Sequence, residues 1–466
     1  MSTIKFNRAA ARTFGAILLF ATATVPLLSQ TFTSLTSFDG PNGSEPSSIV
    51  QGPDGELWGT TSLGGGKTNC GTIYKLSLAG KRSEQFIFNC SVGNSPGGLT
   101  LGADGDFYGV TLFGGTDNGG TVFKLTPNRE FTTLLNFTIN GIGGSAPVGL
   151  VLGAHGNFYG VTSAGGTDLV GTFFKITPTG TLTTLYQFDF THGGQPYAAP
   201  ILGINGDFYG TTYAGGAYGQ GTVYKMTPGG DLTVLHSFPE SGSDGFSPVA
   251  SLVQGRDGNF YGTTPYGGTN NDGTVFKITP TGVLTILHNF DETDGRSPAD
   301  LVQATDGNFY GATGYGGTDD GAGTIFKMTP TGEVTTLHNF DGSDGSNPFT
   351  LFQGTNGNIY GTTGGGGDLN CDPSYGCGTV YSLALGLRPF VETVPSRGTP
   401  GTAVIILGTN LTGATSVSFN GTTAAFTVVS GSEITTTVPT GATTGKVMVT
   451  TKRGTISSNA RFVVTK

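Results

Sequence analysis

Short runs of apolar residues, separated by turn residues, predict β-strands along most of the chain. A stretch of about 50 residues supplies four such runs: PADLVQ at 298–303, NFYGAT at 308–313, GTIFKMT at 323–329 and EVTTLHNF at 333–340. An Asp-Gly turn joins the first two runs, and such turns are a strong hairpin signal. Thr-Pro-Thr-Gly joins the last two. Runs of Leu, Glu and Lys with helical spacing are absent, so we expect an all-β protein.

The four-strand pattern is an internal repeat. The phrase GNFYGTT and its variants occur seven times, 49 to 52 residues apart, and the phrase GTVFKITP follows each copy. A third phrase, LTTLHNF, ends six units but not the seventh, whereas residues 31–38, TFTSLTSF, match it and precede the first unit. An N-terminal strand that completes the last unit would close a ring, and closure leaves only short, protected sheet edges. The sequence therefore predicts a seven-bladed β-propeller over residues 30–384, with the N-terminal strand closing the last blade.

The end of the chain carries a different pattern. After a short linker at 385–388, residues 389–466 alternate apolar and polar positions, with Gly, Pro or Asn turns about every 8–12 residues. This spacing predicts a small immunoglobulin-like β-sandwich.

Both regions resemble known families. The combined phrase FYGTT…GG…GTVFK, over about residues 31–383, resembles the GloVer (choice-of-anchor) tandem repeat of exported bacterial proteins. Residues 388–466 closely resemble an IPT/TIG domain in the opening PSRGTPGTAVIILG, in VSFNG, in VPTGA and in the closing FVV. The repeat resemblance implies no particular activity. The TIG resemblance implies a spacer or a binding module, and we expect it to hold the propeller away from a partner or the envelope.

The N-terminus indicates export. Lys5, Arg8 and Arg12 precede an apolar stretch that runs to Leu28, as in a secretory signal peptide over residues 1–29. An uncleaved membrane anchor is the alternative interpretation. No other apolar stretch approaches the ~20 residues of a membrane helix. We therefore expect a mature chain without a transmembrane segment, secreted or held at the outer cell surface.

The four cysteines fit an oxidising compartment. In a hairpin of strands at 71–77 and 83–89, Cys70 lies opposite Cys90. Cys371 and Cys377 share one loop. We predict these two disulfides, and no zinc site, because neither pair has CxxC spacing with a second His/Cys pair nearby.

Charge and loop length narrow the candidate chemistry. The net charge of -9 argues against a nucleic-acid partner, since such proteins are usually basic. Within each unit the short turns lie at one end of the ring and the longer loops at the other, so a ligand site belongs on the long-loop end or in the channel below it. Aromatic pairs such as Phe260-Tyr261 predict sheets buried on both faces. The recurring lysines of the third strand, and His236, His288 and His338 of the fourth, are interpreted as scaffold.

The candidate ligand-binding residues are acidic and aromatic side chains of the long loops. They are Asp117, Asp168, Tyr213, Tyr266, Asp272, Tyr315, Asp319, Asp368, Asp372 and Tyr375. Such acidic loops could bind calcium, although none matches an EF-hand or an RTX nonapeptide. The sequence indicates no cofactor and leaves any metal unknown.

The pattern favours a non-enzymatic protein that binds a glycan or an extracellular or envelope protein through many weak contacts by repeated loops. An enzyme acting on polysaccharide is the alternative, with acidic residues of the same loops as acid and base. Its site would be sought in the irregular loop 364–377, which holds Asp368 and Asp372. A purely structural envelope protein is a second alternative.

Overall fold

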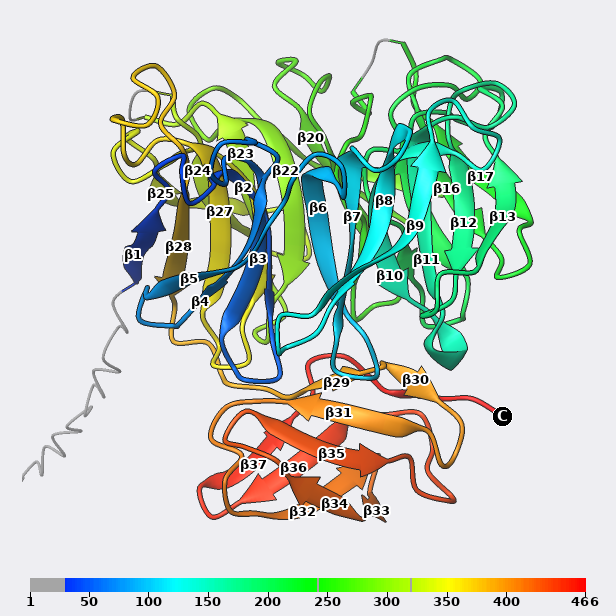
Figure 1. Ribbon diagram of the computed structural model, residues 1–466, viewed down its shortest axis with the longest axis vertical. Helices are drawn as coiled ribbons and strands as arrows, with labels where there is room; N and C mark the ends of the chain where they lie inside the picture. Colours follow the sequence, from blue (N-terminus) through cyan, green and yellow to red (C-terminus); the bar gives the residue numbers. More distant parts are fainter. Residues whose placement is uncertain (1–29, 241–242, 319–320) are drawn as a thin grey trace, which may run out of the picture.

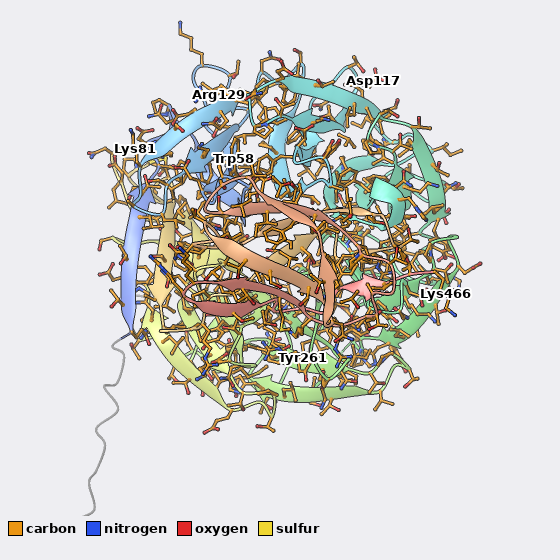
Figure 2. All side chains as sticks on the ribbon, turned by 90° about the horizontal axis from the view of Figure 1, so that it is seen from below. Trp58, Lys81, Asp117, Arg129, Tyr261 and Lys466 are labelled. Atoms are coloured by element: carbon orange, nitrogen blue, oxygen red, sulfur yellow. A yellow bond between two sulfur atoms is a disulfide. The ribbon has the colours of Figure 1, made fainter. Side chains whose placement is uncertain are left out.

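The computed structural model describes residues 30–240, 243–318 and 321–466. Over residues 31–384 the described chain forms seven antiparallel sheets of four strands each, arranged in a ring as in a propeller (Figures 1 and 2). The first three sheets contain β2 (Ser44–Gln51), β3 (Leu57–Leu63), β4 (Thr72–Leu76) and β5 (Arg82–Ile87); β6 (Asn94–Leu101), β7 (Phe107–Phe113), β8 (Asn118–Leu125) and β9 (Phe131–Thr138); and β10 (Ser145–Leu152), β11 (Phe158–Ala164), β12 (Thr172–Ile176) and β13 (Leu182–Gln187).

The next three sheets follow the same order, from the inner to the outer strand. They contain β14 (Ile201–Leu202), β15 (Phe208–Thr212), β16 (Thr222–Met226) and β17 (Leu232–Ser237); β18 (Val253–Gln254), β19 (Phe260–Thr264), β20 (Thr274–Ile278) and β21 (Leu284–Asn289); and β22 (Arg296–Gln303), β23 (Phe309–Tyr315), β24 (Thr324–Met328) and β25 (Val334–Asn339). The described residues contain no α-helix, and the one helical turn is the 3-10 turn η1 (Ala154–Gly156). The all-β prediction is therefore confirmed.

The last sheet is completed by the N-terminus. It contains β26 (Ser346–Gln353), β27 (Ile359–Gly365) and β28 (Thr379–Ala384), and β1 (Thr31–Ser37) pairs antiparallel with β28 from Thr31↔Ala384 to Ser37↔Thr379. A second contact joins the two ends of the ring, since the Thr355 N–H donates to Gln51 Oε1 at 2.9 Å. The predicted closure by the N-terminal strand is confirmed.

The repeated phrases have a physical explanation. In every sheet the last Thr of the FYGTT phrase shares a buried hydroxyl hydrogen bond of 2.8–2.9 Å with the first Thr of the third strand. The pairs are Thr61–Thr72, Thr111–Thr121, Thr162–Thr172, Thr212–Thr222, Thr264–Thr274, Thr313–Thr324 and Thr363–Thr379. The preceding glycine is needed because a Cβ on Gly262 would lie 2.6 Å from the Phe276 ring. The repeated sequence phrases therefore reflect the contacts that each sheet needs to form.

Aromatic side chains bind each sheet to the next. The Tyr261 ring lies 4.1 Å from the Phe309 ring of the following sheet, and the Tyr209 ring lies 3.8 Å from that of Phe260. All four side chains are at most 1 % exposed, and each such burial stabilises the fold by about 2 kcal/mol. The prediction of sheets buried on both faces is confirmed.

The C-terminal domain is a sandwich of two sheets. One contains β29 (Glu392–Val394), β31 (Ala403–Leu407), β35 (Glu433–Thr437) and β34 (Phe426–Val428); the other contains β33 (Thr422–Ala424), β32 (Ala414–Phe419), β36 (Val447–Thr451) and β37 (Gly454–Ser457). A short parallel pair joins β30 (Arg397–Gly398) to β38 (Val463–Val464). Ile406, Val417 and Phe462 are buried between the sheets.

This domain lies directly against the ring, on the side where the short turns gather (Figures 1 and 2). We call that side the turn face. Ile405 and Leu407 of β31 join a buried cluster with Trp58 and Phe107 of the propeller. Arg397 Nη2 donates to the Gly203 carbonyl at 2.7 Å. The domain therefore buries apolar side chains on the ring. Its expected role of holding the propeller away from a partner or the envelope stays a prediction.

Candidate functional site

The opposite end of the ring carries the longer loops, drawn at the top of Figure 1. We call it the loop face; it consists of the connections between second and third strands, such as 265–273, and between successive sheets, such as 290–295. The C-terminal domain lies at the other end, so it does not cover the loop face (Figure 1).

Several candidate aromatic residues stand exposed on the loop face. Tyr375 is 75 % exposed, Tyr315 47 % and Tyr266 45 %. Tyr266 stacks on Phe246 with the ring centroids 5.6 Å apart, so one ring side remains for a ligand. Tyr213 is half-buried. Its ring packs 5.2 Å from that of Tyr197.

Two candidate residues, Tyr315 and Asp272, interact with the same cation, Arg296, at the junction of the β18–β21 and β22–β25 sheets. The Arg296 guanidinium lies 5.5 Å from the centre of the Tyr315 ring. Asp272 lies close enough to Arg296 for the two charges to interact. Desolvation raises the pKa of Asp272; Arg296 opposes this rise, and the carboxylates of the adjoining loop 291–294 add to it. The junction presents an aromatic ring, a cation and carboxylates on one surface.

The other acidic candidates do not come together. Asp117 accepts a hydrogen bond from the Thr138 hydroxyl at 3.3 Å. Asp368 accepts the Asn370 N–H at 2.9 Å, and Asp372 accepts the Ser374 N–H at 2.8 Å, so both cap local turns. Asp168 is exposed. Asp319 lies outside the described residues.

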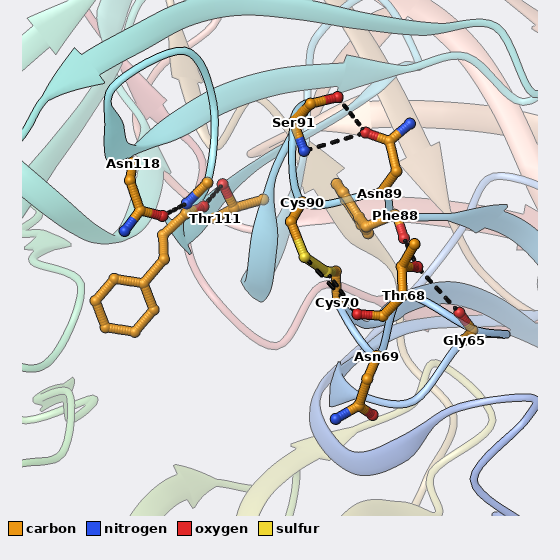
Figure 3. The surroundings of a disulfide bond; sticks show 12 residues. Gly65, Thr68, Asn69, Cys70, Phe88, Asn89, Cys90, Ser91, Thr111 and Asn118 are labelled. Carbon is orange, nitrogen blue, oxygen red and sulfur yellow. Dashed lines mark hydrogen bonds between the residues drawn. A yellow bond between two sulfur atoms is a disulfide. The ribbon is translucent and has the colours of Figure 1, made fainter.

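Both predicted disulfides are formed. Cys70 and Cys90 are bonded with their Cα atoms 5.6 Å apart, and Cys371 and Cys377 with theirs 6.1 Å apart. The first bond fastens the loop before β4 to the end of the β5 segment, where the Thr68 hydroxyl also donates to the Phe88 carbonyl at 2.8 Å (Figure 3). The second holds the loop that carries Tyr375.

The three fourth-strand histidines each face an aspartate of the following loop, a pairing that we did not expect. Nε2 of His288 and Nε2 of His338 each lie 2.7 Å from a carboxylate, and Nε2 of His236 lies 3.6 Å from one. The partners are Asp294, Asp344 and Asp244 respectively. These pairs tie the outer strand of one sheet to the loop leading into the next. A repeated spacing of six residues in two units was the signal in the sequence.

A central cavity of about 500 Å³ lies between the inner segments of all seven sheets. It is lined by residues 47–50, 98–100, 148–150, 197–199, 249–251, 299–300 and 349–350. Asp300 is the one carboxylate among these lining residues. Its desolvation raises the pKa of Asp300 to about 6, although a hydrogen bond with the Ser251 backbone lowers it.

Asp300 was missed by the sequence reasoning. Aligning the units gives small residues at the equivalent positions. They are Ser48, Gly98, Gly149, Ala199, Ser251 and Thr350. A charge at one of seven otherwise small positions was therefore a visible signal.

The part of the chain that the structure describes contains no cluster of side chains that could bind a metal ion. There, no three side chains of His, Cys, Asp or Glu group closely enough to hold an ion. Calcium binding by the loops remains a prediction. The described residues also contain no helix long and apolar enough to cross a membrane.

The repeat and the sandwich both match known families. The Gloeobacter/Verrucomicrobia repeat matches residues 23–202 and 171–381, which together cover most of the chain. The chain belongs to the Gloeobacter/Verrucomicrobia repeat family. In this repeat protein, residues 390–464 also match the IPT/TIG domain. No curated protein matches its sequence.

Solved structures resemble this repeat protein in fold alone. The extracellular domain of a protein described as a hybrid two-component system from B. thetaiotaomicron is 12 % identical, with a TM-score of 0.50; the alignment covers 91 % of this chain and 53 % of that one. The chain thus spans about half the length of that relative. A fungal alcohol oxidase of the AA5 family, in complex with copper, is 16 % identical, with a TM-score of 0.51, over 91 % of this chain and 100 % of that one.

Proposed function

We propose that this repeat protein is a secreted or cell-surface binding protein whose loop face contacts glycans. The observation that carries the proposal is the junction of exposed Tyr315 with Arg296 and Asp272. Tyr266 is exposed at the equivalent position of the preceding sheet, where it stacks on Phe246. Sugar rings pack their C–H faces on exposed aromatic rings, while charged side chains hydrogen-bond the hydroxyl groups. Related loops on seven sheets would add weak contacts into a stronger one.

Export is part of the proposal. All four cysteines are paired in two disulfides, which is typical of proteins in oxidising compartments outside the cytoplasm. The proposed signal peptide at 1–29 lies outside the described residues. The mass of the protein recovered from the culture medium or cell surface tests its removal.

The test of binding uses purified protein with a panel of soluble and insoluble polysaccharides. Depletion of protein from solution measures retention, and new reducing ends measure cleavage. Retention without cleavage, lost in the double variant Tyr266→Ala/Tyr315→Ala, is the expected result. Val283→Ala is the matched control, because Val283 is 62 % exposed in a turn at the opposite end of the same sheet as Tyr266. Equal retention of both variants, or none of the wild type, refutes glycan binding by this junction and leaves a protein partner.

The polysaccharide-active enzyme remains a second candidate because of Asp300. A carboxyl group with a pKa of about 6 inside a cavity suits a general acid or base near neutral pH. Glycoside hydrolysis ordinarily uses two carboxylates, and the cavity lining contains one. Release of reducing ends that Asp300→Asn abolishes would establish this alternative. Release that depends on Asp368 or Asp372 instead would place the site in the loop 364–377.

A further inference from the structure

A second pocket, of about 620 Å³, lies where the propeller meets the TIG domain. The propeller contributes Arg256 and Thr305 from two neighbouring turns of the turn face. The linker contributes Arg388, and the TIG domain contributes residues 389–390, Lys446 and the hairpin segment 453–459. We call it the interdomain pocket.

The interdomain pocket is strongly basic. Its lining includes four cationic side chains, and no Asp or Glu is among the lining residues. The four are Arg256, Arg388, Lys446 and Arg453. This is unusual for a chain whose net charge is -9 and in which charged residues make up only 11 %. None of the four forms an ion pair with a carboxylate of the described residues, whereas Lys75, Lys124 and Lys327 all do.

Two of the four cations, Arg256 and Lys446, are held in place by neutral acceptors. Lys446 Nζ donates to the Ser458 carbonyl at 2.8 Å, and Arg256 Nη2 donates to the Ala304 carbonyl at 3.0 Å. These hydrogen bonds orient the side chains without neutralising their charge. Desolvation, followed by the positive charges of Arg256 and Arg461, holds the pKa of Lys446 below its usual value. The pocket is therefore a region of uncompensated positive charge.

We propose that the interdomain pocket binds a small anionic ligand through a carboxylate, sulfate or phosphate group. Arginine and lysine bind such groups through charge-assisted hydrogen bonds, which are the strong ones. The site lies on the turn face and does not depend on glycan binding at the loop face. A ligand held by both Arg256 and Lys446 bridges the propeller and the TIG domain, so binding stabilises their docking.

Thermal unfolding and isothermal titration of the purified protein test the proposal. The probes are sodium phosphate, sodium sulfate and galacturonate at constant ionic strength, with neutral galactose as the uncharged counterpart of galacturonate. We expect the anions, and not galactose, to raise the melting temperature. Tighter binding of galacturonate than of the inorganic ions indicates an acidic sugar; the reverse order indicates a free phosphate or sulfate group.

The decisive variant is Arg388→Gln/Arg453→Gln. Neither guanidinium hydrogen-bonds a described residue, so removing both breaks no hydrogen bond between the domains; the bonds made by the backbone of Arg388 and Arg453 remain. The matched control is Lys81→Gln/Arg129→Gln, which removes two cations at the rim of the ring (Figure 2). We expect the first variant to bind the anion about tenfold more weakly or worse, and the control to bind like wild type. Equal binding by both variants overturns the proposal. So does the absence of binding by any of the anions at about 10 mM, since a Kd of that size corresponds to a binding free energy of only about 3 kcal/mol.

Discussion

The two ends of the ring differ in what their residues do. At the turn face, the turns are short and contact one another: the N–H groups of Ile204, Arg256, Thr305 and Thr355 each donate to a glutamine side chain of the next sheet. The TIG domain then covers this end. At the loop face the connections are longer, differ between units and present tyrosines that are about half exposed.

The difference separates architecture from function. Lys75 contacts Asp54 at 3.1 Å and Lys124 contacts Asp104 at 3.1 Å, in equivalent positions of two sheets, so a recurring residue repeats a recurring contact. Residues found in only one unit are not explained by such a recurring structural contact. Asp300 in the central cavity and Arg296 at the loop face are two of these, and chemistry is best sought among them.

Closure of the ring gives the largest expected effect. Deleting residues 31–38 removes β1, leaves β28 as an open edge and uncovers the pocket of Phe38, which is fully buried. We expect a loss of at least about 5 kcal/mol in the free energy of unfolding, which is most of the stability of an ordinary domain. Denaturant unfolding measures it. Replacing residues 32–38 with the equivalent strand LTILHNF of residues 284–290 is expected to restore the stability. A deletion variant as stable as wild type would show that the ring does not need its closing strand.

Docking of the TIG domain at the turn face comes next. Arg397 is 8 % exposed and donates from Nη2 to the carbonyls of Gly203 and Ile204 at 2.7 and 3.1 Å. Arg397→Met keeps the apolar stem and removes both hydrogen bonds, so we expect it to weaken docking by about 2–3 kcal/mol. Faster proteolysis of the linker 385–388 is the readout. Arg129→Met, at the exposed rim, is the control and is expected to leave the linker as protected as in wild type.

The repeats made much of the fold predictable from the sequence. Seven copies of one phrase predict the propeller because each unit repeats the same local pairing, such as Thr313 with Thr324. The misplaced strand at 31–38 predicts closure, and the cysteine positions predict both disulfides. All of these signals lie within one unit or at the ends of the series.

Docking and the sites were less predictable, since they join residues far apart in the chain. Arg397 contacts Gly203, 194 residues away, and no local pattern announces that contact. Arg296 and Tyr315 meet because β22 and β23 pair with Arg296 opposite Tyr315. Asp300 and the paired His288 and Asp294 differ in this respect: an alignment of the units against each other would have revealed them.

The central cavity lies between the two faces, and Asp300 tests it. Its folded-state pKa of about 6 lies above the unfolded value of ~3.9, so the folded state disfavours the ionised form. The free energy of unfolding therefore falls as the pH rises from about 4 to about 6 and stays low above that range. We expect Asp300→Asn to be more stable than wild type by about 1–3 kcal/mol at pH 7 and nearly equal to it at about pH 4.

Melting curves over this pH range measure the effect. Asp168→Asn removes an exposed loop carboxylate and is the control, expected to follow wild type at every pH. If Asp300→Asn is no more stable than wild type at pH 7, the carboxylate is either hydrated by water in the cavity or paired with a bound cation.

The loop face should show the smallest effect on stability. Tyr266 and Tyr315 rest on Phe246 and Arg296 with about half of each side chain exposed, so little area is buried on folding. We expect Tyr266→Ala/Tyr315→Ala to change the free energy of unfolding by about 0.5 kcal/mol or less, although the same variant is expected to abolish polysaccharide retention. Tyr310→Ala, five residues before Tyr315, provides the contrast, because it removes a buried ring whose hydroxyl bonds Asp306 at 3.0 Å and should cost about 3–5 kcal/mol. A loop-face variant that unfolds as readily as Tyr310→Ala would mean that these tyrosines are part of the scaffold, and the division between the two faces would fail.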